Sequence, residues 1–474
     1  MQHTQNIDAD QDDFAVINKL IANARKAMAQ LLSANQDRVD EAVTALCWAI
    51  YKPENARETA KLAVAGTGLG NIEDKIIKNQ RKNFGTLRDL LRVKTVGIIE
   101  KFPERGLVKY AKPVGVVGAV VPSTNPCATP VNKAMMAIKG RNAVIIAPSP
   151  AGLQATGRTV ELMRSELEKI GLPANLVQIL PGPISKNLTN TLMQKCDLVV
   201  VTGSQNNVRN AYKSGTPAIG VGAGNVPVII DASADLNDAA RKIMASKCFD
   251  NATSCSSENS VTIQNSIYEE AIDALTRVGG YMCTSDDKQK ILDNLWVDGH
   301  LNRHVLAKDP DVFADVCGLP VAAKQAKFFM VEDTGAGPEK PLSGEKLSLA
   351  LTIYRVPDFE AAISQVKDVL KYQGMGHSVG IHTKTIKNAE LLAERLDVVR
   401  VLVNQAHTFG NGGSFDNGLG FTLTMGCGTW AGNSISENLA YHHFINVTHL
   451  VETIPEDKPS ENELFGTYWS KYGK

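Results

Sequence analysis

Short runs of Val and Ile alternate with helical stretches between residues 143 and 249, and this alternation constrains the fold more than any other feature of the chain. The apolar runs are AVIIA, LVQIL, LVVVTG and VPVIID. Such alternation is typical of right-handed βαβ units around a buried parallel sheet. We therefore predict an α/β protein with a nucleotide-binding type of domain in this region.

Ligands of a parallel sheet bind at the carboxyl ends of its strands, where the following helices present their N-terminal amides. The loops expected at this edge are PSTNP (122–126), APSP (147–150) and TGSQ (202–205). None of them contains the pattern G-x-G-x-x-G. The string GTGLGN at 66–71 comes close to it, but no strand precedes it, so we assign it no phosphate-binding role.

The rest of the chain divides by the same periodicity arguments. Helical spacing over residues 14–49 predicts amphipathic helices at the start, and a Val-rich stretch predicts a hairpin at about 105–116, followed by a buried strand. A second α/β unit has strands expected at ENSVTI, LALTIYRV, SVGIHT and VVRVLV, and HHFINVTHLVETI predicts a late strand before a charged end that forms a tail or a surface clasp. We place the domains at 1–234, 235–434 and 435–474.

Composition excludes several classes of protein. Of 474 residues, 43% are hydrophobic, and 50 Lys and Arg balance 50 Asp and Glu, so the chain is too apolar to be disordered and offers no net field for nucleic acid or an acidic membrane. Its polar, acidic start lacks the features of a signal peptide, and no apolar run is long enough to span a membrane. Eight cysteines include no C-x-x-C pair and no zinc-ligand spacing. We expect a metal-free cytoplasmic enzyme with reduced thiols.

Cys255 differs from most of the other cysteines in its surroundings. It lies in FDNATSCSSENSV, a loop of small and polar residues between a helix and a Val-rich strand. A nucleophilic thiol needs such a polar, accessible setting, whereas structural cysteines have apolar neighbours. Cys127, in NPCATP, has a similar context and is the rival candidate, and both residues are also compatible with plain structural roles.

Eight strings spread over residues 14–450 resemble the CoA-acylating branch of the aldehyde dehydrogenase superfamily. The resemblance implies an aldehyde dehydrogenase fold with a Rossmann-like cofactor domain (1–234), a second α/β domain that carries the nucleophilic cysteine (235–434) and a small β oligomerisation element. The chain is also similar to the aldehyde dehydrogenase half of bifunctional aldehyde-alcohol dehydrogenases, and its TWAGNSISEN string resembles the acylating sulfoacetaldehyde dehydrogenases. The strings are TGLGNIEDKIIKN, PSTNP, TGS, GVGAGNVPVIID, the Cys loop ending in SEN, EKLS, GMGH and GCGTWAGNSISEN.

By this resemblance Cys255 is the nucleophile, whose thiolate adds to the aldehyde carbon and ends as a thioester. Asn125 in PSTNP supplies a side-chain amide that stabilises the developing oxyanion together with the Cys255 backbone N–H. Without the resemblance, Asn125 is better explained as a turn residue between two prolines.

The most informative difference from hydrolysing relatives is a missing glutamate. Hydrolysing relatives carry a glutamate that activates water against the thioester, and the matching string here has Val221 at that position. The acyl-enzyme then awaits a better nucleophile, and the thiol of coenzyme A fits. His377 in GMGH occupies a position where acylating relatives also have His and is the candidate base for that thiol, although a solvated loop histidine explains it equally well.

The resemblance also assigns the cofactor contacts. Gly203 and Ser204 match the turn that meets the pyrophosphate, Gly222 lies in the neighbouring glycine string, and Glu345 matches the glutamate that binds the nicotinamide ribose. Hydrolysing relatives carry a Lys and a Glu in the loop that here reads APSP, so Ser149 is the polar contact there. The missing carboxylate leaves both NAD and NADP open.

We therefore expect an enzyme that converts a short aldehyde, coenzyme A and NAD(P)+ into an acyl-CoA. The competing hypotheses are a hydrolysing dehydrogenase and a non-catalytic protein that retains the fold. Sulfoacetaldehyde is the candidate substrate, with acetaldehyde and propionaldehyde as alternatives. An anionic aldehyde requires donors near the nucleophile, and Ser256, His407 and the NGG turn are the candidates. By resemblance we expect a homodimer or homotetramer built on the hairpin and the late strand.

Overall fold

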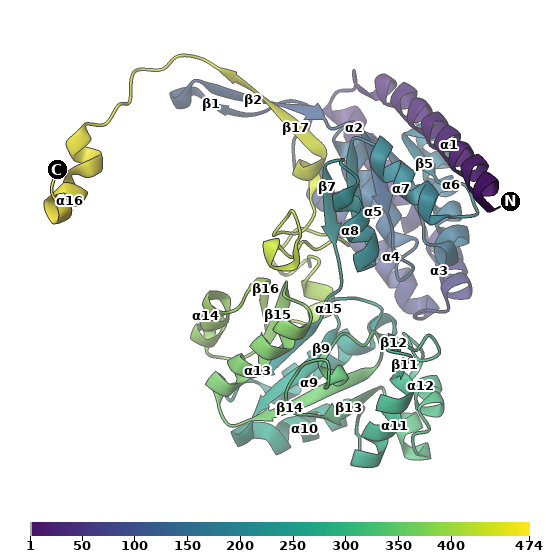
Figure 1. Ribbon diagram of the computed structural model, residues 1–474, viewed down its shortest axis with the longest axis vertical. Helices are drawn as coiled ribbons and strands as arrows, with labels where there is room; N and C mark the ends of the chain where they lie inside the picture. The colour runs from purple at the N-terminus through teal and green to yellow at the C-terminus, as the bar shows by residue number, and fades with distance from the viewer. Residues whose placement is uncertain (1) are drawn as a thin grey trace.

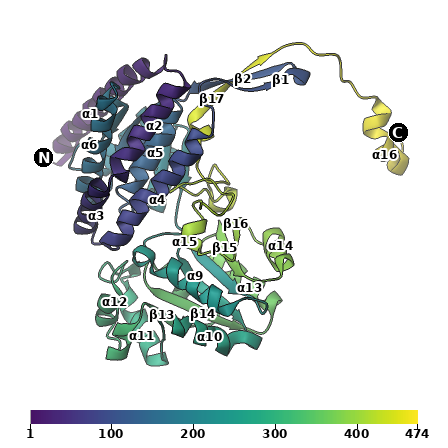
Figure 2. The ribbon, with the colours of Figure 1, turned by 180° about the vertical axis from the view of Figure 1, so that it is seen from behind.

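The computed structural model describes residues 2–474, with side chains described from Asp12 onward. Two α/β units lie one above the other, and an arm extends away from them (Figure 1, Figure 2). No helix in the described part of the chain is both long and apolar enough to cross a membrane. The polar start that argued against a signal peptide falls largely outside the residues with described side chains.

The first unit contains a five-stranded parallel sheet in the order β5-β4-β3-β6-β7. Its middle strands are buried along their whole length, which explains their continuous apolar sequence. The predicted runs AVIIA, LVQIL and LVVVTG correspond to β4, β5 and β6, whereas the short strand β7 was not predicted. The strands are β3 (Val116–Val120), β4 (Ala143–Ala147), β5 (Val177–Ile179), β6 (Leu198–Thr202) and β7 (Ala218–Val221).

Helices cover both faces of this sheet and include the amphipathic helices predicted at the start of the chain (Figure 1). GTGLGN forms the turn between α3 and α4, so a helix and not a strand precedes it. The helices are α1 (Gln2–Leu31), α2 (Gln36–Tyr51), α3 (Pro53–Thr67), α4 (Ile72–Leu91), α5 (Ala128–Lys139), α6 (Leu153–Lys169), α7 (Lys186–Lys195) and α8 (Gln205–Lys213).

The second unit contains a seven-stranded sheet in the order β10-β13-β14-β9-β8-β15-β16, in which every described pair is parallel. All four strands predicted for this region are present as β9, β14, β15 and β16. The strands are β8 (Val226–Ile230), β9 (Glu258–Gln264), β10 (Gly280–Met282), β13 (Phe328–Glu332), β14 (Ala350–Val356), β15 (Gly376–His382) and β16 (Val398–Val403).

Helices flank this second sheet, and a two-stranded ribbon of β11 (Trp296–Val297) and β12 (His300–Leu301) lies beside it. The helices are α9 (Leu236–Cys248), α10 (Tyr268–Arg277), α11 (Ser285–Leu295), α12 (Pro310–Val316), α13 (Phe359–Tyr372), α14 (Ile386–Arg395) and α15 (His407–Gly410).

The predicted domain boundary at residue 234 is wrong. The run VPVIID forms β8, which pairs with β9 and β15 in the second sheet and not with the first. The chain crosses between units in the loop 222–225, directly after β7. The error has a physical cause, because β8 is a fully buried parallel strand like those before it and its sequence carries no mark of the sheet it joins.

The arm consists of a three-stranded antiparallel sheet in the order β1-β2-β17 and a terminal helix. The hairpin predicted at 105–116 instead spans 97–113, because its outer strand β1 is half exposed and lacks a continuous apolar run. The late strand is present as β17, and the charged end contains a helix. The elements are β1 (Gly97–Phe102), β2 (Leu107–Pro113), β17 (Ile445–Val451) and α16 (Glu461–Tyr472).

Candidate active site

Loops from both units line a cleft of about 290 Å³. The first unit contributes the loops that follow β3, β6 and β7, and the second contributes the loop before β9 and a segment before β14. Six of the predicted site residues meet in this cleft, namely Asn125, Gly203, Ser204, Gly222, Cys255 and Glu345.

Cys255 lies between a short 3-10 turn and β9. The backbone before it is strained, because Asp250, Asn251 and Ala252 all have left-handed φ angles of 50°, 52° and 60°. Non-glycine residues adopt this conformation only where the surrounding structure enforces it. Burial, followed by the nearby Glu345, raises the pKa of the Cys255 thiol to about 12. The sulfur is therefore protonated at neutral pH until a base takes the proton.

Asp250 is held by two lysines of α4. Its carboxylate, which is fully buried, accepts hydrogen bonds from Lys75 at 3.0 Å, from Lys78 at 2.5 Å and from Thr253 at 2.7 Å. Lys75 also donates to the Thr124 carbonyl at 3.1 Å. The same cluster therefore supports the nucleophile loop and the loop after β3. Sequence reasoning missed these residues, because charges on a helix normally indicate a solvated face.

Asn125 directly follows the carbonyl that Lys75 binds. Its side chain lines the cleft beside Cys255, and its buried Oδ1 has no hydrogen-bond partner among the described residues. Because Oδ1 is an acceptor and cannot stabilise an oxyanion, a donor role at this place would fall to the amide Nδ2. Its position agrees with the predicted role as an oxyanion donor.

His377 begins β15 and is buried, so the interpretation as a solvated loop residue is wrong. Its Nε2 and the Cys255 Cβ both lie 3.0 Å from the position that a Cβ would take at Gly224, so this glycine keeps the space between them open. On its other side, Nδ1 contacts Ser378 Oγ at 2.8 Å, which contacts His407 Nε2 at 2.9 Å.

The His377 ring is neutral near pH 7. Burial, followed by Arg400 and His407, holds the pKa of His377 well below its usual value. If Nδ1 carries the proton and donates it to Ser378, the lone pair of Nε2 faces the gap at Gly224. Nε2 has no partner among the described residues, so it is free to accept a proton there.

Val221 and Glu345 both affect whether water could attack a thioester in this cleft. Val221 is a buried apolar residue at the end of β7, so it supplies no carboxylate. Glu345 lies in the cleft, but burial raises its pKa to about 8. At neutral pH this carboxyl is therefore mainly protonated.

A larger cavity of about 590 Å³ adjoins the cleft at the carboxyl edge of the first sheet. Ser149, Gly203 and Ser204 line it, and Ser204 is the N-cap of α8, so helix-terminal amides face this space. Nothing lies within 4 Å of a Cβ placed on Gly203. The lining includes Lys186 but no Asp or Glu. These features fit a dinucleotide, and they include nothing that would repel a 2′-phosphate.

The rival nucleophile lies elsewhere. Cys127 is 2% exposed in the core of the first unit, where its sulfur contacts the Thr59 carbonyl, and burial raises its pKa to about 11. The predicted substrate donors are also turned inward. Ser256 is bonded to Asn411, and His407 to Ser378.

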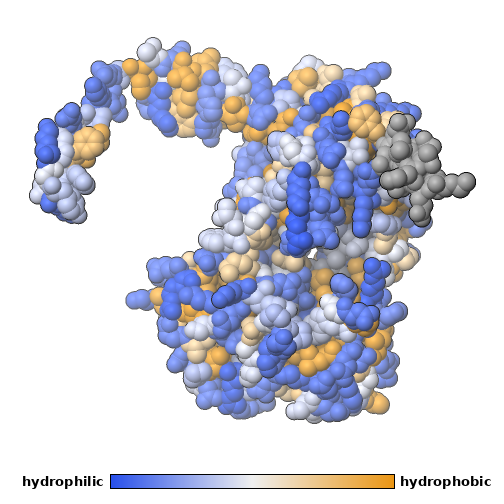
Figure 3. Space-filling model, viewed as in Figure 1, coloured by the Kyte–Doolittle hydropathy of each residue, from blue (hydrophilic) through white to orange (hydrophobic). Residues whose placement is uncertain are grey.

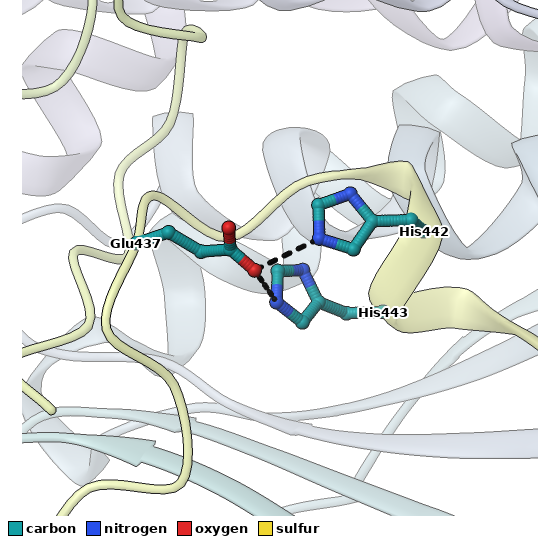
Figure 4. A group of neighbouring side chains, drawn as sticks. All are labelled: Glu437, His442 and His443. Atoms are coloured by element: carbon teal, nitrogen blue, oxygen red, sulfur yellow. Dashed lines mark hydrogen bonds and ion pairs between the residues drawn. The ribbon is translucent and has the colours of Figure 1, made fainter. Parts of the chain in front are cut away.

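The adjacent residues His442 and His443 contact one carboxylate. Both Nε2 atoms lie near Glu437 Oε1, at 2.9 and 3.0 Å (Figure 4). These contacts connect the end of the GCGTWAGNSISEN loop to the turn before β17. One ligand atom from each of the three residues lies within 4.8 Å of the others, but this group is not part of the cleft.

Comparison with known proteins shows the family of the chain. The aldehyde dehydrogenase family matches residues 6–284. The acylating sulfoacetaldehyde dehydrogenase of Cupriavidus necator is 49% identical over 456 residues, which cover 96% of this chain and 92% of the relative. The acetylating succinate-semialdehyde dehydrogenase of Clostridium kluyveri is 40% identical, with 95% and 99% covered. An acetylating aldehyde dehydrogenase structure from Geobacillus thermoglucosidasius aligns with a TM-score of 0.91 at 34% identity and covers 95% and 99% of the two chains.

The chain therefore belongs to the aldehyde dehydrogenase family. Within it, the chain is an acylating aldehyde dehydrogenase, an oxidoreductase that acts on aldehyde groups with NAD(P). The predicted resemblance and the predicted α/β fold are confirmed. The roles of the individual site residues stay predictions.

The two candidate cysteines are separable by mutation. Cys255→Ala should lower kcat by at least about 10⁴-fold, because removing a nucleophile leaves only binding and oxyanion stabilisation. Cys127→Ala should keep kcat within about threefold, since its thiol lies in a packed core. Steady-state formation of reduced nicotinamide measures both, and circular dichroism controls for folding. The reverse pattern would make Cys127 the nucleophile.

Proposed function

We propose that this protein oxidises a short anionic aldehyde, sulfoacetaldehyde, to its coenzyme A thioester. One observation carries the proposal: Cys255 and Asn125 share a cleft, and the strand end beside it has the apolar Val221 where hydrolysing relatives carry the glutamate that activates water. The two relatives compared above are named for sulfoacetaldehyde and succinate semialdehyde, and both of these aldehydes end in an anionic group.

The reaction begins at Cys255: His377 Nε2, which faces the same gap at Gly224, takes the thiol proton and passes it to solvent, and the thiolate adds to the aldehyde carbon to give a thiohemiacetal. The Asn125 amide and the Cys255 backbone N–H stabilise the oxygen that becomes negative, and losing one such donor costs about 3 to 4 kcal/mol of transition-state stabilisation. NAD(P)+, when bound beside the loops of Gly203 and Ser204, supplies the hydride acceptor. Loss of hydride leaves a thioester on Cys255.

Coenzyme A then releases the acyl group. His377 Nε2 faces the gap at Gly224, on the other side of which Cys255 lies, so it is placed to take the proton of an incoming thiol as the new carbon–sulfur bond forms. The tetrahedral oxygen of this second step again faces Asn125. Side chains and organic co-substrates perform every step of this scheme, without a metal.

The alternatives fit the site less well. A hydrolysing dehydrogenase needs a carboxylate or another base for water, and Val221 occupies the place where hydrolysing relatives have one. A non-catalytic protein would not need to keep Asn125 and Cys255 together in one cleft. Acetaldehyde and propionaldehyde are alternative substrates, and the assay with and without coenzyme A includes both.

Omission of coenzyme A separates these alternatives. With NADP+ and sulfoacetaldehyde, we expect sustained turnover only in the presence of coenzyme A. Without it, absorbance at the nicotinamide band should show a burst of at most one turnover per chain, followed by a rate lower by at least about 100-fold. Continuous formation of free acid without coenzyme A would contradict the proposal. Failure with acetaldehyde, propionaldehyde and sulfoacetaldehyde alike would favour a non-catalytic protein.

For the cofactor we propose that NADP+ is accepted, with Lys186 near its 2′-phosphate. The support is the large cavity, whose lining contains this lysine and no carboxylate. Lys186→Gln should raise KM for NADP+ about tenfold and KM for NAD+ much less, because only NADP+ has the extra charge. Lys195→Gln, at the other end of α7, is the matched control. Equal effects on both cofactors would contradict this assignment.

We also propose a cytoplasmic homodimer or homotetramer. All eight cysteines are free, as in a reducing compartment. Apolar side chains gather on the extended arm (Figure 3), where Val447, Leu450 and Val451 of β17 and Leu464 and Tyr468 of α16 are exposed. Such a surface is typical of a subunit contact.

Light scattering on a sizing column tests the assembly. The full chain should have two or four times the mass of one chain, and a chain that ends at residue 452 should form a smaller assembly because it lacks α16. A monomeric full chain would contradict the proposal.

A further inference from the structure

A second, smaller cavity meets the cleft at the reacting centre. It shares Asn125, Ser254 and Leu423 with the cleft but contains none of the cofactor loops. Ser254 is the residue before the nucleophile. An aldehyde bound at Cys255 can therefore extend its tail into this cavity while the cleft holds the cofactor. The cavity is only about 30 Å³, which favours a short tail.

Three cations of α4 line this small cavity: Lys78, Arg81 and Lys82. They follow one another at helical spacing and so share a face of α4. The rest of the lining is mainly apolar and includes Ile77, Phe249, Phe409 and Leu423, and it contains no Asp or Glu.

Two carboxylates lie near these cations: Asp250 binds Lys78, and Asp416, which accepts a hydrogen bond from Ser414, acts on Arg81 without pairing with it. Lys78 shares the single carboxylate of Asp250 with Lys75. Lys82 is buried and donates only to the Gly412 and Gly413 carbonyls, at 3.1 and 3.3 Å. Burial, followed by Arg81 and Lys78, lowers the pKa of Lys82 to about 7, so a bound anion would favour its charged form. Among the described residues, neither Lys82 nor Arg81 has a carboxylate within ion-pair distance. Buried cations without a counter-ion are costly, and an anion would offset that cost.

Arg81 is both held in place and incompletely bonded. Its guanidinium lies 5.4 to 5.7 Å from the ring centres of Phe409, Phe415 and Phe421. Nη2 donates to Ser414 Oγ at 2.9 Å, whereas the buried Nη1 has no partner in the part of the chain with described side chains. A preorganised guanidinium with a free N–H is suited to bind an oxyanion.

We propose that Arg81, assisted by Lys82, binds the anionic end of the aldehyde substrate and thereby sets its substrate specificity. The inference rests on the proposed function and adds the recognition site for the substrate's charge. The shared chemistry is a sulfonate or carboxylate one to three carbons from the aldehyde carbon. Ser256 and His407, the donors expected from sequence, have no part in it.

Arg88 provides a matched control on the same helix. It stacks on two of the same rings, at 5.2 Å from Phe415 and 4.9 Å from Phe421. Unlike Arg81, it pairs with Asp89 at 2.7 Å and does not line the cavity. Replacing Arg88 thus removes a comparable cation and the same kind of aromatic contact without touching the proposed site.

The test compares kcat/KM for sulfoacetaldehyde, succinate semialdehyde and the neutral propionaldehyde, with coenzyme A present. Arg81→Met should lower kcat/KM for sulfoacetaldehyde about 100-fold, mainly through KM, and reduce its preference over propionaldehyde at least about tenfold. Arg81→Lys should restore part of the preference, and Arg88→Met should leave it unchanged. Ethanesulfonate, an unreactive analogue, should inhibit the wild type competitively and Arg81→Met much more weakly.

The result for succinate semialdehyde distinguishes a sulfonate site from a carboxylate site. The site is assigned to the anionic group of the aldehyde whose kcat/KM falls more in Arg81→Met. Equal losses for charged and neutral aldehydes in Arg81→Met, or no loss for sulfoacetaldehyde, would overturn the inference and leave the proposed function intact. Absence of coenzyme A-dependent turnover with all aldehydes in the wild type would instead overturn the proposed function.

Discussion

The active site depends on one buried carboxylate. Asp250 holds Lys75 and Lys78 of the first unit against the nucleophile loop of the second, and through Lys75 it also supports the carbonyl before Asn125. The left-handed backbone before Cys255 would relax without such a constraint. Removing the carboxylate would leave two buried ammonium groups uncompensated, so the cluster links the stability of the interface to the geometry of catalysis.

Sequence reasoning was most successful where a residue's role depends on short-range pattern. Buried strands such as β3 and β6 are recognised by their continuous apolar residues, and the loops after them contain Asn125 and Ser204, which meet in the cleft. It was less successful where partners are distant. Asp250 lies 172 to 175 residues from the lysines that bind it, and no local property of α4 indicates that this charged face is buried.

The remaining errors have the same origin. β8 resembles the strands before it and yet belongs to the other sheet. His377 follows a glycine-rich turn that suggests exposure, but it enters a buried strand. Ser256 and His407 are polar residues close to the nucleophile in sequence or space, but their side chains bond to neighbouring protein groups. In each case long-range packing decides the orientation of a side chain.

Residues on successive turns of α4 have two different roles. Lys75 and Lys78 hold the catalytic loops, and Arg81 and Lys82 line the cavity beyond them. Lys78 belongs to both groups, because it binds Asp250 and also lines the small cavity. A substitution of Lys78 would therefore change the support of the Cys255 loop and the charge of the cavity together, and enzyme engineers would meet this as coupling between mutations on adjacent turns.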